Sequence, residues 1–406
     1  MSNEIAVNGH KPKLLVATTT FPRWENDAGP APFVFDLAIH LQKYFEITVL
    51  APHFPGAAEH EVWKGMEVCR FRYLPDNREK LADGQGLQNH LRKRSSARYE
   101  AMPFMISEYL AGRRLLKDRK FDAVNSHWLV PSGLIFARLA KHFKTRHIVT
   151  VHAADYFMLN KSSTGRWLMR RIARSSQAVI PVNQMMADGI KKLWPSARTH
   201  VMPMGFDPQR FREVEPGPVA KLRQELSLQG KKIILYVGKL TEKKGLRNLL
   251  EAVKILGQDM DNFQLLIVGG GGWKPHLERM ASKLNVTYRV RFAGRVPHRE
   301  VPFYYQLADV VALPAQPDKH GETEGMPVVI LEALASGKPV VGTSYCSAPE
   351  PLKQGGFIEI KEPTPAEIAA GLRKALSGDF RADFKAVDNY SWEQVAKFYS
   401  EVIAGG

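Results

Sequence analysis

Two glutamates, Glu324 and Glu332, stand with seven residues between them in the segment GETEGMPVVILEALASGKPVV. Pro327 suits the first turn of a helix and Gly337 suits its end, so the backbone amides of residues 325–328 would form an exposed helix N-terminus that binds phosphate. Glu332 falls within the apolar run VVILEALA, where an unpaired carboxylate would be costly. A ribose or sugar diol presents two hydroxyl donors to such a carboxylate, and Glu324 could hold a sugar in the same way. Alternatively, Glu332 is a core carboxylate paired with an arginine, and Glu324 is only an acidic residue at a helix start.

Two lysines flank a turn in the segment YVGKLTEKKGLRNLLEA. A buried strand is expected to end at Gly238, and Lys239 and Lys244 lie in the loop that leads into the next helix. Two ammonium groups near the carboxyl end of a strand can neutralise a diphosphate leaving group as a glycosidic bond breaks. Gly245 would let the helix approach the strand closely. The alternative is a lysine-rich loop that is only solvated surface.

A histidine, His152, ends the strand-like segment HIVTVH. An isolated histidine is more often structural than catalytic, but its place at a strand terminus favours contact with a ligand. Asp155, three residues further on, is a candidate base. His127 and Trp128 also follow a strand, and their positions are equally compatible with packing beneath a site and with ligand contact.

Alternating strand-like and helix-like segments must position these side chains. Residues 12–205 repeat a βαβ rhythm, beginning with KLLVATT, APFVFDLAIHLQKYF and EITVLAP, and a second series opens at KKIILYVG. The pattern predicts an α/β protein with two doubly wound parallel sheets. Such sheets bind ligands at the carboxyl ends of their strands, so the strand-to-helix loops should carry the chemistry.

The order of these segments predicts two domains and a terminal helix. The first domain is expected to span residues 1–205 and the second residues 206–390. Between them, FDPQRFREVEPGPVA is rich in proline and charge, which is typical of an interdomain linker. Residues 391–406 form an amphipathic helix whose aromatic face could pack back on the first domain.

Composition argues against several classes of protein. The sequence has no run of about 18 apolar residues and begins without a signal-like segment, so a cytoplasmic protein is expected. Its two cysteines, Cys69 and Cys346, have no companion at metal-ligand or redox spacing. VGGGGWKP lacks the third glycine of a dinucleotide fingerprint, and no serine nucleophile elbow is present. Metal, nicotinamide and hydrolase chemistry are therefore not expected.

The net charge of +16 is unevenly placed: residues 1–200 hold 30 Lys and Arg against 17 Asp and Glu. Such a field suggests an anionic partner, which could be a phosphorylated acceptor, a lipid surface or nucleic acid. In GRWLMRRIARSS, Arg166, Arg170 and Arg174 share one helix face, and in PFMISEYLAGRRLLKDRK an apolar stretch runs into basic residues. These segments predict reversible docking at the inner face of an anionic membrane, where the protein would reach a lipid-linked or otherwise membrane-borne acceptor. The alternative is that both helices bury their apolar residues in the core.

Several of these segments together resemble the retaining glycosyltransferases of family 4. The glutamate pair in EGMPVVILEALASGKPVV and the glycine and lysine loop of residues 238–245 resemble that family's donor-binding segments. TTTFPRWENDAGPAPFVFDLA resembles its acceptor loop, HIVTVHAADYF its histidine-containing strand end, and VMPMGFDPQRF its interdomain crossing. The resemblance covers nearly the whole chain.

This resemblance implies a GT-B fold, in which two Rossmann-like doubly wound domains face each other across a cleft, with an N-terminal acceptor domain and a C-terminal donor domain. It implies transfer of a hexose from a nucleotide-diphosphate sugar, with retention, without a metal and without a further cofactor. Glu332 would hold the ribose, Glu324 the sugar, and Lys239 and Lys244 the diphosphate, although arginine is commoner in the family at position 239. His152 would face the transferred sugar. The remaining assignments are Gly325, Met326, Pro327, Val328, Gly238, Arg295 and Val296 on the donor side, and Gly29 and Pro30, with Asp155, on the acceptor side.

Two other functions are compatible with parts of this pattern. A nucleotide-sugar epimerase or a phosphorylase could use the same scaffold, because a fold does not fix a reaction. The paired glutamates favour transfer. A basic nucleic-acid-binding protein would explain the charge, but the sequence has no recognition helix, aromatic ribonucleoprotein strand or zinc finger, so no nucleic acid is expected as a partner. The donor base, the donor sugar and the acceptor are not readable from the residues.

Overall fold

The computed structural model describes residues 10–25, 27, 33–81, 97–319, 321–378, 380 and 382–405. The chain forms two compact units. Unit 1 comprises Met1–Gly205 together with Trp392–Gly406, and unit 2 comprises Phe206–Ser391. The chain therefore leaves unit 1 at residue 205 and returns to it at residue 392.

Unit 1 contains a seven-stranded sheet in the order β3-β4-β2-β1-β5-β6-β7. All neighbouring strands are parallel except β3, which pairs antiparallel with β4 at one edge. Alternate residues of β1 enter two different cores. Leu14 and Val16 lie in one core, and Leu15 and Ala17 lie in the other. This two-residue period is expected of a strand buried on both faces. The strands are β1 (Lys13–Ala17), β2 (Glu46–Pro52), β3 (His60–Trp63), β4 (Met66–Phe71), β5 (Ala123–His127), β6 (Arg146–Val151) and β7 (Ala178–Pro181).

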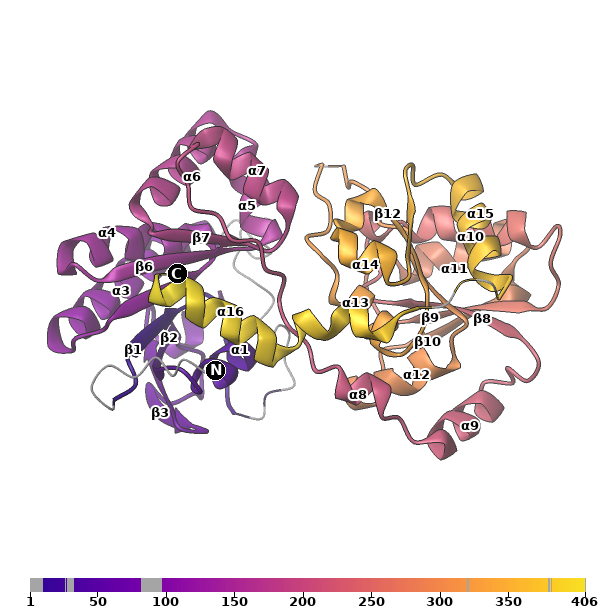
Figure 1. Cartoon of the computed structure of the whole chain (residues 1–406), viewed down its shortest axis with the longest axis horizontal. Helices are drawn as coiled ribbons and strands as arrows, with labels where there is room; N and C mark the ends of the chain where they lie inside the picture. Colours follow the sequence, from indigo (N-terminus) through magenta and orange to yellow (C-terminus); the bar gives the residue numbers. More distant parts are fainter. Residues whose placement is uncertain are drawn as a thin grey trace. The chain divides into compact units, whose positions relative to one another are not determined.

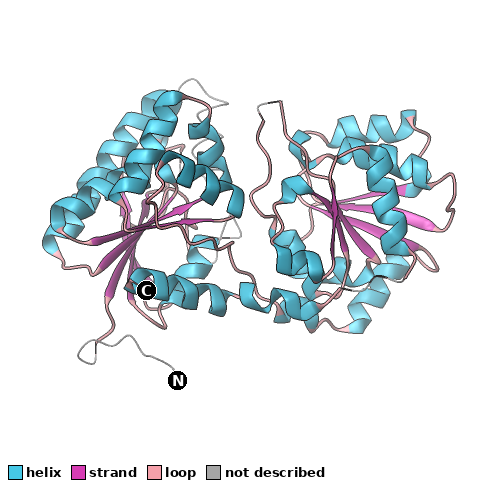
Figure 2. Ribbon diagram, turned by 45° about the horizontal axis from the view of Figure 1, so that its top comes forward, coloured by secondary structure: helices cyan, strands magenta, loops and turns pink. Residues whose placement is uncertain are grey.

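Helices cover both faces of this sheet (Figure 2). Two of them begin at side-chain caps: Ser162 accepts from the Gly165 amide, and Asn183 accepts from the Met186 amide. Residues 200–205 form no strand, although Thr199 just before them makes a single bridge to β7 and the amides of His200 and Met202 donate to β7 carbonyl oxygens. The helices are α1 (Phe33–Leu41), α3 (Ala97–Asp118), α4 (Leu134–Phe143), α5 (Ala153–Asn160), α6 (Ser163–Ser175), α7 (Gln184–Leu193) and α16 (Trp392–Ala404).

The C-terminal helix α16 packs in unit 1 beside α1 (Figure 1). Its buried face carries Val395, Ala396 and Tyr399, which belong to the same core as β1. The ring of Trp392 occupies the space that a Cβ on Gly205 would need, at 2.5 Å. Residue 205 thus has to be glycine for the helix to reach this place.

Unit 2 contains a six-stranded, wholly parallel sheet in the order β10-β9-β8-β11-β12-β13. Its central strands are continuous apolar runs because helices bury both faces. In β8, Ile233 and Leu235 enter one core, and Ile234 and Tyr236 enter the other. The strands are β8 (Lys232–Val237), β9 (Phe263–Val268), β10 (Val290–Gly294), β11 (Val310–Leu313), β12 (Val340–Thr343) and β13 (Phe357–Ile360).

The helices of unit 2 include two within the stretch that was expected to be a linker. α8 (Gln209–Arg212) and α9 (Pro216–Glu225) belong to the second unit, and Phe211 is buried in its core. Proline at the start of α9 is compatible with a helix because the first amides need no partner within it. The other helices are α10 (Leu246–Leu256), α11 (Lys274–Lys283), α12 (Val301–Leu307), α13 (Val328–Ala335), α14 (Glu350–Gln354) and α15 (Pro365–Leu376).

Candidate active site

Glycines let two backbone loops meet at the carboxyl edge of the sheet in unit 2. β8 is followed by Gly238 and β9 by Gly269, with φ of 152° and 136°. A Cβ on Gly269 would lie 1.9 Å from the Gly238 carbonyl oxygen. Gly245, with φ 67°, begins α10 where a Cβ would lie 1.7 Å from the Pro314 carbonyl oxygen. The close approach inferred for Gly245 is thus present, because only glycine fits there.

An ion-paired cluster lies in this part of unit 2. A 3₁₀ turn, Glu242–Lys244, presents two lysines to one carboxylate. Lys244 Nζ lies 2.8 Å from Glu324 Oε2, and Lys243 Nζ lies 3.2 Å from Glu324 Oε1. Burial acts to raise the pKa of Glu324, but the charges and hydrogen bonds of Lys244 and Lys243 outweigh it and hold that pKa below its ordinary value. Glu324 is therefore a carboxylate at neutral pH.

The sequence assigned Lys244 to the diphosphate and Glu324 to the sugar, and the structure brings these two side chains into direct contact. A donor bound there would have to share or replace this pairing. Lys243 is a third member that the sequence reasoning passed over, although it stands in the same lysine-rich segment. Lys239 is exposed in the same loop.

Glu332 is buried on α13, with 8% of its surface exposed. The hydroxyl of Tyr305, on α12, donates a hydrogen bond of 2.7 Å to Glu332 Oε2. Burial raises the pKa of Glu332, and the Tyr305 hydrogen bond and the charge of Arg210 offset this only in part. Tyr305 therefore supplies a hydrogen bond to Glu332 from within the protein, and Arg210 acts on it only through its charge, which is close to the alternative interpretation of a core carboxylate. Nothing in the sequence spacing pointed to Tyr305.

The other donor-side residues lie around the start of α13 and after β10. Pro327 precedes the first residue of the helix, Val328, and no side chain caps these first amides. Gly325 and Met326 are half-buried just before it. Arg295 is exposed, and its side chain packs across Gly270. A Cβ on that glycine would lie only 2.8 Å from the Arg295 Nε. Val296 is half-buried beside Arg295.

In unit 1, His152 lies directly after β6, at the residue that begins α5. Its Nε2 is 3.2 Å from Nδ1 of His127, which ends the neighbouring strand β5. The rings of Trp128 and Phe33 lie 4.7 and 5.1 Å from the His152 ring, measured between centroids. Burial lowers the pKa of His152 to about 3 and also lowers that of His127. Both imidazoles are neutral at pH 7, so one nitrogen of the pair donates and the other accepts.

Asp155 is fully buried on α5. Its Oδ2 accepts a hydrogen bond of 2.5 Å from the Leu129 amide. The bond holds the turn after Trp128, a residue with a left-handed φ of 69°. Burial raises the pKa of Asp155 to about 7. The position favours a role in shaping this turn over direct contact with an acceptor.

Gly29 and Pro30, expected on the acceptor side, lie outside the described residues. The structure thus brings together Lys244 and Glu324 in unit 2, and His152 and His127 in unit 1. His127 could have been selected from the sequence, because β5 and β6 both end in a histidine and adjacent parallel strands end at the same edge.

Family models match both halves of the chain. Residues 28–210 match glycosyltransferase family 4, and residues 219–389 match the glycosyl transferases of group 1. A GDP-mannose-dependent alpha-(1-6)-phosphatidylinositol monomannoside mannosyltransferase of Mycolicibacterium smegmatis is 27% identical over 97% of this chain and 98% of its own length.

Solved structures share the two-unit architecture. Sucrose-phosphate synthase from Thermosynechococcus elongatus superposes with a TM-score of 0.72 at 18% identity, covering 97% of this chain and 100% of that one. Anabaena HepE in complex with UDP gives a TM-score of 0.69 at 16% identity, with the same coverage. At these identities the likeness shows the fold.

Proposed function

Because the chain belongs to glycosyltransferase family 4, with a GT-B fold and nucleotide-sugar dependence, we propose that it transfers a hexose, with retention and without a metal, to an acceptor at a membrane surface. The observation that carries the proposal is the cluster of Lys243, Lys244 and Glu324 at the carboxyl edge of the sheet in unit 2. Two lysines at this place could offset the charge of a departing diphosphate, which is the task a divalent cation performs in other transferases.

The proposed step breaks the bond between the anomeric carbon and the diphosphate and forms a bond from that carbon to an acceptor oxygen. The electron pair leaves with the diphosphate, which Lys243 and Lys244 would stabilise, and the proton of the acceptor hydroxyl would pass to the departing phosphate oxygen. Glu324 would exchange its lysine contacts for hydroxyls of the sugar. Retention is taken from the family resemblance and would follow if acceptor and leaving group occupy the same face of the sugar.

A GDP-linked mannose is the first donor to be tried, because the mannosyltransferase relative that spans nearly the whole chain is named for it. UDP-glucose is the second, because it is bound in a structural neighbour of the same fold. The test is release of nucleoside diphosphate from a panel of GDP-, UDP- and ADP-sugars, with and without lipid extract. Lipid-stimulated release from one donor supports the proposal, whereas release from none contradicts it.

A membrane-borne acceptor is supported by the surface of α3. Four large apolar side chains at one-turn spacing are exposed there: Tyr99 (84%), Met102 (65%), Ile106 (51%) and Leu110 (55%). Basic residues follow on the same helix, including Arg113, Arg114 and Lys117. An exposed apolar stripe beside basic residues is typical of a helix that lies in the interface of an anionic membrane. Among the described helices, none is long and apolar enough to cross a membrane.

The second segment expected to dock, α6, fits the alternative interpretation better. Met169 and Ile172 are buried in the core of unit 1. Arg170 and Arg174 lie over the ring of Trp194, at 5.8 and 5.6 Å from its centroid. Trp167 is the one large apolar side chain of this segment that is exposed. The membrane proposal therefore rests on α3.

A further inference from the structure

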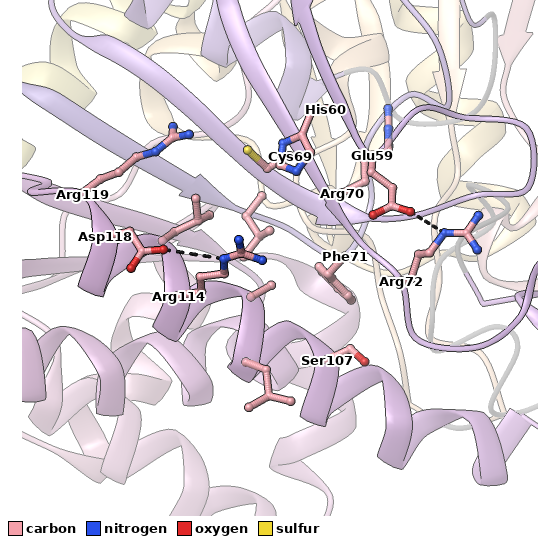
Figure 3. A pocket seen from close by; sticks show the side chains of 14 residues that line it. Glu59, His60, Cys69, Arg70, Phe71, Arg72, Ser107, Arg114, Asp118 and Arg119 are labelled. Carbon is pink, nitrogen blue, oxygen red and sulfur yellow. Dashed lines mark ion pairs between the residues drawn. The ribbon is translucent and has the colours of Figure 1, made fainter.

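Three metal-ligating side chains meet on one face of the β3–β4 hairpin, at the edge of the sheet in unit 1. The antiparallel register places His60 opposite Cys69, and Glu67, two residues before Cys69, points to the same face. A nitrogen of His60, a carboxylate oxygen of Glu67 and the sulfur of Cys69 all lie within 4.8 Å of one another. His60 and Cys69 line a cavity between this hairpin and α3 (Figure 3).

The contacts of Glu67 prepare one of its oxygens for a metal. The Cys69 thiol donates to Oε1 at 3.6 Å, while Oε2 accepts from the Arg119 guanidinium and from the Thr48 hydroxyl. Arg119 thus orients the carboxylate from behind, as partners of metal ligands commonly do. The proton of the thiol occupies the place where a cation would sit.

We propose that His60, Glu67 and Cys69 bind Zn²⁺. Nitrogen, oxygen and thiolate sulfur are ligands that zinc binds, and three protein ligands would leave the fourth tetrahedral position to water. Zinc bonds of about 2.0 Å to nitrogen and about 2.3 Å to sulfur place ligand atoms about 3.5 Å apart. The ligand atoms now lie within 4.8 Å of one another, and a movement of the exposed His60 side chain would shorten its distances to the other two ligands. Binding releases the Cys69 proton to solvent, and water from the cavity of 460 Å³ fills the fourth position.

A neighbouring group, His53, Glu79 and Asp76, has similar composition but is already satisfied. His53 Nδ1 lies 2.5 Å from Glu79 Oε2, and its Nε2 lies 2.9 Å from the Ala57 carbonyl oxygen. Asp76 is ion-paired with Arg72 at 2.6 Å. A metal would have to displace these bonds, whereas His60 is exposed at the rim of the cavity.

The site lies away from His152, so its role would be structural. β2, β1 and β5 separate β4 from β6, which corresponds to roughly 19 Å at the usual strand spacing. Zinc would tie the edge strand β3 to β4 and, through Arg119, to the end of α3. Sugar transfer itself would proceed without it, so this inference stands independently of the proposed function.

The test uses the full chain, dialysed against chelator and titrated with Co²⁺, whose thiolate complex absorbs light. One equivalent of Co²⁺ should produce a thiolate-to-cobalt band that Zn²⁺ abolishes. The band should vanish in Cys69→Ser and persist in Cys346→Ser, the matched control, since the chain has only these two cysteines. Zn²⁺ should also raise the Tm of the wild type and of Cys346→Ser.

His60→Ala provides a second variant, at an exposed position where folding is not at risk. It should weaken cobalt binding by about tenfold or more while leaving the Tm of the metal-free protein unchanged. Absence of the band in the wild type, its survival in Cys69→Ser, or equal affinity in His60→Ala would each overturn the proposal.

Discussion

At the scale of single residues, unit 2 contains charges that neutralise one another before any donor is bound. Glu324 has two lysine partners and only 12% of its side chain is exposed. A diphosphate would supply the negative charge that Lys243 and Lys244 now obtain from Glu324, and this would free the carboxylate for sugar hydroxyls. Under the proposed function, the ion pair would be a resting arrangement that a donor replaces without leaving a buried charge unpaired.

Lys244→Ala should lower turnover by about a hundredfold, because one preorganised contact to the leaving diphosphate is lost. The KM for the donor should change less than the turnover. Steady-state kinetics with the donor identified in the panel measures both. Lys274→Ala is the control, because Lys274 pairs with Glu278 on the surface of α11. Near-normal turnover of Lys244→Ala in a folded protein would remove Lys244 from the reaction.

Glu332→Ala should raise the dissociation constant of the nucleoside diphosphate at least about tenfold, since a charged hydrogen bond contributes about 1.5–3 kcal/mol. Tyr305→Phe is the informative control, because it keeps the carboxylate but removes the hydroxyl that now bonds it. It should lower the Tm and alter nucleotide affinity less. Calorimetric titration that gives equal affinity for wild type and Glu332→Ala would assign Glu332 to the core alone.

His152→Ala should abolish most transfer and leave binding of the nucleoside diphosphate unchanged, because the histidine is proposed to contact only the sugar. His147→Ala separates this effect from a loss of stability. His147 is also buried, but both its nitrogens are engaged, at 2.8 Å with Ser126 and 3.0 Å with Ser176. A Tm that collapses equally in both variants, with transfer lost in both, would favour a structural role for His152.

At the scale of elements, apolar runs predicted the central strands well but missed some strands at or near an edge of the sheet. KLLVATT and KKIILYVG were recognised because strands buried on both faces are continuously apolar. β3 and β13 were missed because each has only four residues and few of them are buried: Trp63 alone in β3, and Phe357 and Ile360 in β13. α8 and α9 were taken for linker because proline and charge dominate them, although Phe211 anchors the stretch in the core.

The candidate site, like the fold, was predictable only in part. Glu324 and Lys244 belong to recognisable segments, but their pairing and the contact of Tyr305 with Glu332 depend on packing between distant elements. Spacing along the chain gives no information on such contacts. The two basic helices illustrate the same limit. Both are amphipathic in sequence, and only packing reveals that α6 buries Met169 and Ile172, whereas α3 buries Phe104 and Leu116 but leaves a stripe from Tyr99 to Leu110 exposed.

Membrane docking is therefore expected to depend on α3 and not on α6. Met102→Glu combined with Ile106→Glu should abolish co-sedimentation with phosphatidylglycerol vesicles at low salt, because it places charge on the apolar stripe. A variant with Arg166, Arg170 and Arg174 each changed to Gln should bind nearly as well as wild type. Binding of the wild type should require anionic lipid and weaken as salt increases. Equal sedimentation with neutral vesicles, or none at low salt, would indicate an acceptor free in solution.

At the scale of the whole molecule, the chain crosses between its units twice, so the last residues of the sequence belong to the first unit. α16 supplies Val395, Tyr399 and Ile403 to the core of unit 1, and Lys43 pairs with Glu393 at 3.1 Å. Residues far apart in sequence thus complete one core. The stability of unit 1 depends on a segment that follows all of unit 2.

Deleting residues 392–406 should destabilise unit 1 while leaving unit 2 intact. Loss of three or more fully buried apolar side chains removes about 5 kcal/mol or more, a large share of the stability of a domain. Differential scanning calorimetry should show the transition of unit 1 at lower temperature in the truncated chain. Nucleoside diphosphate identifies the other transition, since it should raise the Tm of unit 2 alone, in both proteins. A truncation that shifts the nucleotide-sensitive transition, or shifts neither, would contradict this assignment of α16.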